Sequence, residues 1–407
     1  IIFVCALPVF LFSYSLDELI EMSHKNRAVE ASAHLEISKQ KSLDSLKSSY
    51  LPSLDIGGTY QNVYDETSAL SKNSLRGEAS FRYTLYDGGK ENALYSQLSS
   101  NIDASKKNTQ ALKNQLSLDI AKLYFEYHSL LSDKEATNQE IKQLQAEFQR
   151  LQNFLEAGSV TKDEVSKIDS RLKSATVLLY EIDLDVQKVL HSLEYYTSQE
   201  LSSIAGGSII KLKNEEEASA RADIESLKFD AEALMYEAKS KKSASLPTIY
   251  FDNTLSHTEY YFDDKSKDSG FLVETQNIAS VNLLWNILDF GTIEKNYEAK
   301  YYEYMSKKST LEYEKHKASV AYRLAKKSLE IAMLKIDSTK ATLDAAASTY
   351  ELVKIRYQNG VIDNVAYLQA LSEVVDAKRG YERALYDVEV KKAELIYYSG
   401  KDVKEYL

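Results

Sequence analysis

The chain has 407 residues, and 61 acidic against 50 basic side chains give it a formal net charge of −11. This acidic balance argues against a nucleic-acid partner, because proteins that bind nucleic acids neutralise the phosphate backbone with Lys and Arg. The single cysteine, Cys5, lies near the start of the chain. The remainder therefore holds no disulfide and no thiolate metal site.

Residues 1–12 are almost entirely apolar and are followed by two small polar residues, Ser13 and Ser15. This pattern is typical of the hydrophobic region and cleavage zone of a secretory signal peptide. A buried strand or a short membrane anchor is the alternative, although about 12 residues are too few to span a membrane as a helix. We expect residues 1–15 to be a signal-peptide remnant.

The rest of the sequence repeats one pattern. Its landmarks are Leu51-Pro52 and Leu246-Pro247, then Asp87-Gly88-Gly89 and Asp289-Phe290-Gly291, then Gly158 and Gly360. The last two pairs have the same offset, since 291 − 89 and 360 − 158 both give 202. A duplication at matched spacing predicts two similar structural units.

We expect the first repeat at residues 16–205 and the second at 216–398, with an equatorial linker at 206–215 and a C-terminal tail at 399–407. The first repeat should contain a helix at 17–48, a β-hairpin at about 53–86, a long helix at 90–155 and a return helix at 160–200. The corresponding elements of the second repeat are expected at 216–244, 248–288, 292–357 and 362–398.

Neither glycine nor proline occurs in residues 90–155 and 292–357, and this absence predicts two long helices. Each stretch of about 66 residues would be roughly 100 Å long as a helix. Apolar and small residues follow a spacing of three and four from Tyr322 to Tyr357, as in a coiled coil. Gly158 and Gly360 then end the helices and form the hairpin-tip turns.

Between each proline and the following Asp-x-Gly turn, apolar and polar residues alternate. Four strands of about 10–12 residues match tilted transmembrane β-strands, whereas a soluble sheet with one wet face is the alternative. The transitions from helix to strand fall at Pro52 and Pro247, and those from strand to helix at Asp87, Gly89, Asp289 and Gly291. The face expected to meet lipid consists of Leu54, Ile56, Tyr60, Leu75, Phe81, Tyr83, Leu85, Ile249, Phe251, Val281, Leu283 and Trp285.

Two hairpins cannot close a barrel, and open sheet edges are not tolerated in lipid. Copies of the chain must therefore combine, and three copies would supply twelve strands. The six histidines are scattered, and the sequence contains no nucleophile elbow, phosphate-binding loop or metal-ligand spacing. We therefore expect no enzyme activity and no cofactor.

The duplicated order of helix, Leu-Pro, two strands, Asp-x-Gly, long helix, Gly and return helix resembles the TolC-like outer membrane efflux protein family. The resemblance rests on Tyr50-Leu51-Pro52, Leu85-Tyr86-Asp87-Gly88-Gly89, Leu246-Pro247, Trp285-Asn286-Ile287-Leu288-Asp289-Phe290-Gly291 and Arg356-Tyr357-Gln358-Asn359-Gly360. It implies a mainly α fold with membrane β-strands. Long antiparallel coiled-coil hairpins would form a periplasmic tunnel that continues a twelve-stranded trimeric barrel in the outer membrane of a Gram-negative bacterium.

The resemblance also implies a passive channel that works with a periplasmic adaptor (membrane fusion) protein and an inner-membrane RND or ABC transporter. The cargo is left open between drugs or metals in efflux and a protein in type I secretion. A soluble periplasmic coiled-coil scaffold or adaptor is the alternative function.

The resemblance implies adaptor contact at the hairpin-tip turns of Gly158 and Gly360, and the family's periplasmic gate corresponds to the same hairpin tips. Tyr357 matches a gate tyrosine and Glu164 its acidic partner, so the resemblance implies a hydrogen bond between them in the closed state. The gate arginine of the family falls at Ile362, and its two pore aspartates fall at Ala366 and Gln369. The nearby acids that could take over cation selectivity, or simply form solvated helix faces, are Asp163, Asp363 and Glu373.

Overall fold

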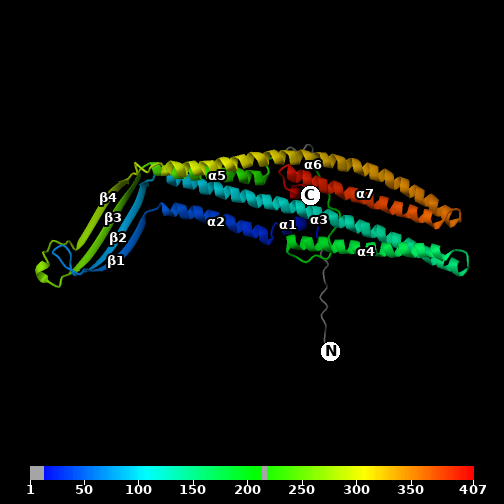
Figure 1. The fold of residues 1–407 in the computed structure, drawn as a ribbon, viewed down its shortest axis with the longest axis horizontal. Coiled ribbons are helices and arrows are strands. Elements are labelled where there is room, and N and C mark those ends of the chain that lie inside the picture. Colours follow the sequence, from blue (N-terminus) through cyan, green and yellow to red (C-terminus); the bar gives the residue numbers. More distant parts are fainter. Residues whose placement is uncertain (1–12, 213–217) are drawn as a thin grey trace, which may run out of the picture. The chain divides into compact units, whose positions relative to one another are not determined.

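The computed structural model describes residues 13–212 and 218–407 (Figure 1). Residues 1–12 of the leader expected at 1–15, residues 213–215 of the expected linker and the first two residues of the helix expected at 216–244 lie outside the described residues. The chain divides into two compact units: unit 1 comprises Ile1–Ala31, Thr109–Asp223 and Lys315–Leu407, and unit 2 comprises Ser32–Asn108 and Ile224–Glu314. Both units draw on both sequence repeats.

The described residues are mainly helical, as the sequence predicts. The helices are α1 (Leu16–Ser23), α2 (Arg27–Ser49), α3 (Lys90–Glu156), α4 (Lys162–Thr197), α5 (Ala222–Lys242), α6 (Thr292–Gln358) and α7 (Asn364–Tyr398). Helices α3 and α6 have 67 residues each and run without interruption. Within the described chain, no helix combines the length and the apolar character needed to cross a membrane.

The helix expected at 17–48 is wrong as a single element, because the chain breaks between α1 and α2. Asn26 makes the break: its side-chain oxygen accepts a hydrogen bond from the backbone N–H of Val29 at 3.0 Å, and its amide donates to the carbonyl of Tyr196 at 3.1 Å. An asparagine in this role caps a new helix. The helix expected from 216 is also shorter than predicted, since α5 begins at Ala222.

The core of unit 1 lies where α1 meets α3, α4 and α7. Leu16, Leu19 and Ile20 of α1 are fully buried there with Tyr124 and Ile396. Part of the expected equatorial linker belongs to this core, because Ile204 and Ile210 are buried in it as well. The Tyr124 hydroxyl secures this segment by donating to the Ala205 carbonyl at 2.8 Å.

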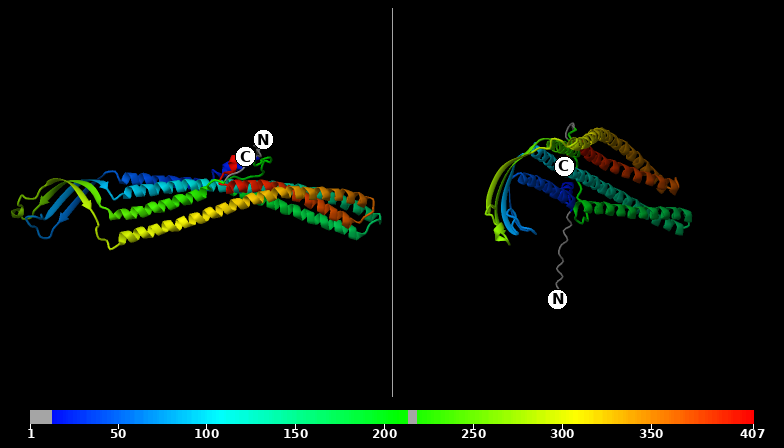
Figure 2. Two further views of the ribbon diagram at one scale, coloured as in Figure 1. Left: turned by 90° about the horizontal axis from the view of Figure 1, so that it is seen from above. Right: turned by 60° about the vertical axis from the view of Figure 1, so that its left-hand side comes forward.

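Unit 2 holds one antiparallel sheet in the order β1 (Ser53–Asn62), β2 (Asn73–Tyr86), β3 (Thr248–Tyr261) and β4 (Thr275–Leu284). The four strands curve together as one ribbon (Figure 2). Strands β2 and β3 pair along their length, so the two hairpins of the two repeats form a single sheet.

The register separates an apolar face from a polar face, because residues directly opposite each other in antiparallel strands point to the same side. Leu54 lies opposite Phe81, and Tyr83 lies opposite Phe251, which lies opposite Val281. The other face is charged, and Arg82 of β2 pairs with Asp252 of β3 at 2.8 Å. Two asparagines, Asn253 and Asn277, interrupt the apolar face.

Two members of the expected lipid face depart from the regular pairing, one at a bulge within β2 and one beyond the end of β4. A register shift between Thr84 and Tyr86 leaves Leu85 without an opposite residue, as a β-bulge does. Trp285 follows the end of β4, and its indole N–H donates to the Ser245 carbonyl at 3.0 Å. Period-two alternation alone does not reveal either departure.

Candidate functional site at the ends of the helical hairpins

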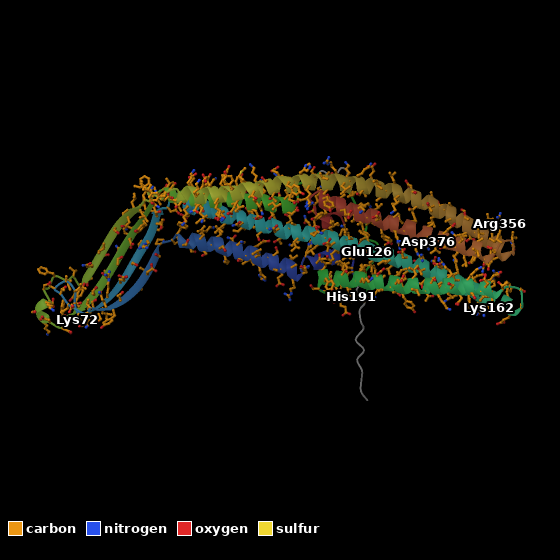
Figure 3. The ribbon with its side chains drawn as sticks, viewed as in Figure 1. Lys72, Glu126, Lys162, His191, Arg356 and Asp376 are labelled. Carbon is orange, nitrogen blue, oxygen red and sulfur yellow. The ribbon has the colours of Figure 1, made fainter. Side chains whose placement is uncertain are left out.

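The two helical hairpins of unit 1 turn in the same way. Gly158 follows α3 with φ 74° and Gly360 follows α6 with φ 71°, a conformation that favours glycine. In both turns the glycine N–H bonds three residues back, and the next N–H bonds five residues back. This is the Schellman pattern that ends a helix. Lys162 at the start of α4 and Arg356 near the end of α6 mark these ends in Figure 3.

Five polar residues of α3, here called the α3 polar stripe, face the second hairpin, α6 and α7. Their spacing of three and four places them on one side of the helix. Asp133, Thr137 and Glu140 are at most 1% exposed, so their polar atoms depend on protein partners. The members are Asp133, Thr137, Glu140, Gln143 and Glu147.

At the end of the stripe nearest the turns, Glu147 holds Tyr357 of α6. The Tyr357 hydroxyl donates to Glu147 Oε1 at 2.7 Å, and Arg150 pairs with the same carboxylate at 2.7 Å. The Arg150 guanidinium also lies over the Tyr357 ring, 4.8 Å from its centre. Burial and the hydrogen bond to Glu147 raise the pKa of Tyr357, so the hydroxyl remains a donor at neutral pH.

The hydrogen bond predicted between Tyr357 and Glu164 is therefore not the one found here. Glu164 lies in the first turn of α4, and its backbone carbonyl accepts from the side-chain amide of Asn364 at 3.2 Å. That contact does join the two hairpins, although through the backbone. The Tyr357 ring stacks on Tyr367 of α7 with centres 4.7 Å apart, which fixes the hydroxyl near α3 rather than α4.

Further along the stripe, Glu140 bridges both hairpins. One carboxylate oxygen accepts from Arg171 of α4 at 2.7 Å, and the other lies 3.4 Å from Arg379 of α7. Arg171 also donates to Ser372 of α7 at 3.0 Å. Removing one member of such a buried ionic group leaves an uncompensated charge, which is strongly destabilising.

Two more contacts complete the stripe, one at its far end and one between Glu140 and Glu147. Asp133 pairs with Arg383 of α7 at 2.7 Å, and Gln143 accepts from the Tyr350 hydroxyl of α6 at 2.8 Å. Thr137 accepts from Arg379 of α7 as well, so every member of the stripe contacts α6 or α7. The sequence analysis did not predict this stripe. Its signal was a set of polar residues at helical spacing beside the apolar seam of Ile141 and Leu144.

The remaining predicted gate acids have local roles. Asp163 forms an exposed pair with Lys167 at 2.7 Å, and Glu373 accepts from Gln369 at 2.7 Å. Asp363 caps α7 by accepting from the Ala366 N–H at 3.0 Å. Within residues 13–212 and 218–407, no group of three His, Cys, Asp or Glu side chains is arranged to hold a metal ion.

The predicted transition residues lie where the sheet of unit 2 meets its helices. Pro52 and Pro247 directly precede β1 and β3. Asp87 accepts from the N–H groups of Gly89 and Glu91, and Asp289 accepts from those of Gly291 and Ile293. Each aspartate thereby caps the start of a 67-residue helix.

The family model of outer membrane efflux proteins matches residues 21–197 and 215–401. Among solved structures, the outer membrane protein VceC of Vibrio cholerae is 16% identical with a TM-score of 0.82, covering 95% of this chain and 96% of its own. The Campylobacter jejuni CmeC outer membrane channel is 18% identical with a TM-score of 0.83, over 95% and 85%. The Neisseria gonorrhoeae MtrE outer membrane channel is 15% identical with a TM-score of 0.80, over 95% and 89%. No curated protein sequence matches the chain.

The chain belongs to the outer membrane efflux protein family, because the family model covers most of its length. Its fold is that of these outer membrane channels, and its family places it in the outer membrane. Its general role is that of an efflux channel.

Proposed function

We propose that three copies of this chain form a channel-tunnel that conducts substrates passively from the periplasm to the exterior. The observation that carries the proposal is the four-stranded sheet, whose outer strands β1 and β4 each pair on one side only. Its apolar face is exposed, with Ile56 at 85% and Val281 at 67%. A sheet of this kind is unstable in lipid until its edges are paired.

Three sheets joined edge to edge would make a closed barrel of twelve strands. The apolar face, with Leu54 and Phe81, would then meet lipid. The opposite face, with Arg82 paired to Asp252 and Arg76 paired to Glu78 at 3.0 Å, would line water. Polar lumen residues alternating with apolar lipid-facing residues are the normal pattern of such barrels.

The tunnel itself supplies no energy. We propose that a periplasmic adaptor and an inner-membrane pump of the RND or ABC type deliver the cargo. The cargo would be drugs or metals in efflux, or a protein in type I secretion.

We further propose that the α3 polar stripe holds the periplasmic end in its closed form. Glu140 and Glu147 join the first hairpin to Arg379 and Tyr357 of the second, so opening requires these contacts to break. Because the contacts are buried, each is worth more than an exposed ion pair. The predicted acids Asp163, Glu164, Asp363 and Glu373 would lie around this gate.

Single-channel conductance in planar bilayers tests the gate. Glu140→Gln and Tyr357→Phe should raise the conductance, with the larger increase for Glu140→Gln because Glu140 contacts two arginines. Tyr313→Phe, an exposed tyrosine of the same helix α6, is the matched control and should behave as wild type. Wild-type conductance in both stripe variants would contradict the gate.

Assembly is tested separately. Envelope fractionation after carbonate washing should leave the protein with the outer membrane, and native mass spectrometry in detergent should give a trimer. A monomer that stays soluble without detergent would overturn the channel and favour a periplasmic scaffold.

A further inference from the structure

A groove of about 440 Å³, here called the α3–α7 groove, runs between these two helices inside unit 1. Its size is within the range of sites for small organic ligands. An ion pair lies at each end: Lys122 pairs with Glu394 at 3.0 Å, and Asp133 pairs with Arg383 at 2.7 Å. Eleven positions separate the two α3 residues and eleven separate the two α7 residues, so the antiparallel helices keep one matched level along the groove.

Two acidic residues lie between these ion pairs, Glu126 on α3 and Asp387 on α7. Glu126, labelled in Figure 3, is exposed, and Asp387 is half-buried. Among the described residues, neither carboxylate accepts a hydrogen bond or forms an ion pair. Two lysines of this region, Lys122 and Lys391, pair with Glu394 instead, at 3.0 and 2.9 Å. Four carboxylates against two cations give the lining of the groove a formal net charge of −2.

The matched level brings the two free carboxylates close together. It places Asp387 opposite Ser129, which is three positions from Glu126. Three positions are about 4.5 Å along a helix axis, and packed helices lie about 8–10 Å apart. Like charges at this distance repel each other, and one extended molecule can reach both of them.

A third acceptor, at one end of the groove, also lacks a donor. Asp133 lines the groove and is 1% exposed. Its Oδ2 accepts from Arg383 at 2.7 Å, whereas its Oδ1 has no hydrogen-bond partner among the described residues. A buried acceptor without a partner costs free energy, which a donor supplied by a ligand would recover.

The lining between the charged groups is apolar, and it narrows the chemical class of the ligand. Phe125 and Leu130 come from α3, and Tyr386 and Val390 come from α7. A single metal ion does not fit, because no three acidic or histidine side chains of the described chain are close enough to share one. A flexible chain of methylene groups with several ammonium groups fits better. Its methylenes would contact the apolar lining, and its ammonium groups would bind carboxylates and aromatic rings.

We propose that the α3–α7 groove binds a linear aliphatic polyamine, with ammonium groups at Glu126 and Asp387 and a further donor toward Asp133. Because Glu126 belongs to the first hairpin and Asp387 to the second, the bound polyamine links the two hairpins beyond the end of the α3 polar stripe. All the residues involved belong to one copy of the chain. The inference therefore does not depend on the proposed trimer, and failure of one leaves the other standing.

Titration calorimetry with spermidine, on the purified protein in detergent, tests the site. The double variant Glu126→Gln with Asp387→Asn should bind spermidine roughly tenfold or more weakly, because hydrogen bonds to charged groups are the strong ones. The matched control, Glu135→Gln with Glu382→Gln, removes two charges from the same helices outside the groove and should bind as wild type does. Equal weakening in the control, or no binding by wild type, would overturn the proposal.

The choice of cation tests the ligand class. Pentylamine has one ammonium group on a comparable chain, and Mg²⁺ has two charges without a chain. Both should bind more weakly than spermidine to wild type, because neither can contact two carboxylates and the apolar lining together. Affinity for Mg²⁺ equal to that for spermidine would show simple attraction to an acidic surface and would contradict a polyamine site.

Ser129→Lys tests the position of the ligand without removing a carboxylate. The new ammonium group would lie level with Asp387 and one turn from Glu126, so it should occupy the place of a ligand ammonium. The variant should unfold at a higher temperature than wild type and should gain no further stability from spermidine, which wild type should gain. Ser129→Gln, a polar side chain without the charge, is the control and should still be stabilised by spermidine. Undiminished stabilisation of Ser129→Lys by spermidine would overturn the assignment.

Discussion

The two junctions where a strand gives way to a long helix have the same cap but different middle residues. In the first repeat the sequence is Asp87-Gly88-Gly89, and in the second it is Asp289-Phe290-Gly291. Both middle residues have positive φ, 73° for Gly88 and 55° for Phe290. The aspartate and the last glycine are common to both because they make the cap and the turn.

The surroundings explain why the middle residue differs. A Cβ at Gly88 would overlap the Ser243 carbonyl oxygen and lie 2.9 Å from Leu246 Cβ. Phe290 is 91% exposed, so its side chain meets no such neighbour among the described residues. The first junction is packed against the turn before β3, whereas the second junction, at Phe290, is exposed and is here called the open junction. Duplication thus retained the hydrogen bonds of the cap, while packing decided the residue between them.

The largest expected loss of stability comes from adding a Cβ at the first junction. Gly88→Ala should destabilise the protein by about 3 kcal/mol or more, because steric overlap adds to the cost of a left-handed residue. Gly89→Ala is the matched control, since its φ is also positive but no atom lies within 4 Å of the added Cβ. It should cost only about 1–2 kcal/mol. Urea unfolding in detergent, followed by far-UV circular dichroism, measures both; equal losses would contradict the packing argument.

A smaller effect is expected from the caps. Asp87→Ala should cost about 1–2 kcal/mol through lost backbone hydrogen bonds. It should cost more than Asp289→Ala, because Asp87 also accepts from the Tyr50 hydroxyl at 2.9 Å. The second repeat has Ser245 at the place of Tyr50. In a Tyr50→Phe background the two alanine variants should lose similar stability, and a persisting difference would show that another contact separates the junctions.

The cap of the second junction also predicts a pH dependence. Hydrogen bonds from the Ile293 and Gly291 N–H groups hold the pKa of Asp289 below its usual value of 3.8. A carboxylate with a lowered pKa in the folded state stabilises the protein fully above about pH 4 and loses this contribution as pH falls through the folded pKa. Unfolding of wild type and Asp289→Ala between pH 3 and 7 should therefore differ at neutral pH and converge in acid. A difference that is constant with pH would contradict this role.

Much of the fold could be predicted because a few residues determine the ends of the elements. Pro52, Pro247, Gly158 and Gly360 fall where the chain changes direction, and the absence of glycine and proline predicts the long helices. The break at Asn26 was missed because an asparagine caps a helix only if the preceding turn ends, which depends on its contact with Tyr196.

The gate could be predicted only in part. The hairpin ends follow from the sequence of each repeat, but the partner of Tyr357 depends on how far one hairpin is shifted along the other. That shift is set by contacts such as the one between Glu140 and Arg379, which are about 240 positions apart in the sequence. The residue spacing within a single helix therefore does not predict it. The sequence therefore predicts where the gate tyrosine lies but not that Glu147 binds it.

The smallest effect concerns the open junction. Phe290→Gly makes the second junction Asp-Gly-Gly, like the first, and removes a left-handed phenylalanine. It should stabilise the protein by up to about 1 kcal/mol, because the relieved strain of about 1–2 kcal/mol exceeds the extra backbone entropy that glycine loses on folding. Urea unfolding in detergent measures it, with Phe290→Ala as the control that keeps the strain and removes the ring. If Phe290→Gly and Phe290→Ala both lose stability, the ring is bound in the assembled protein by lipid or by a neighbouring copy, and the second junction is open only in the single chain.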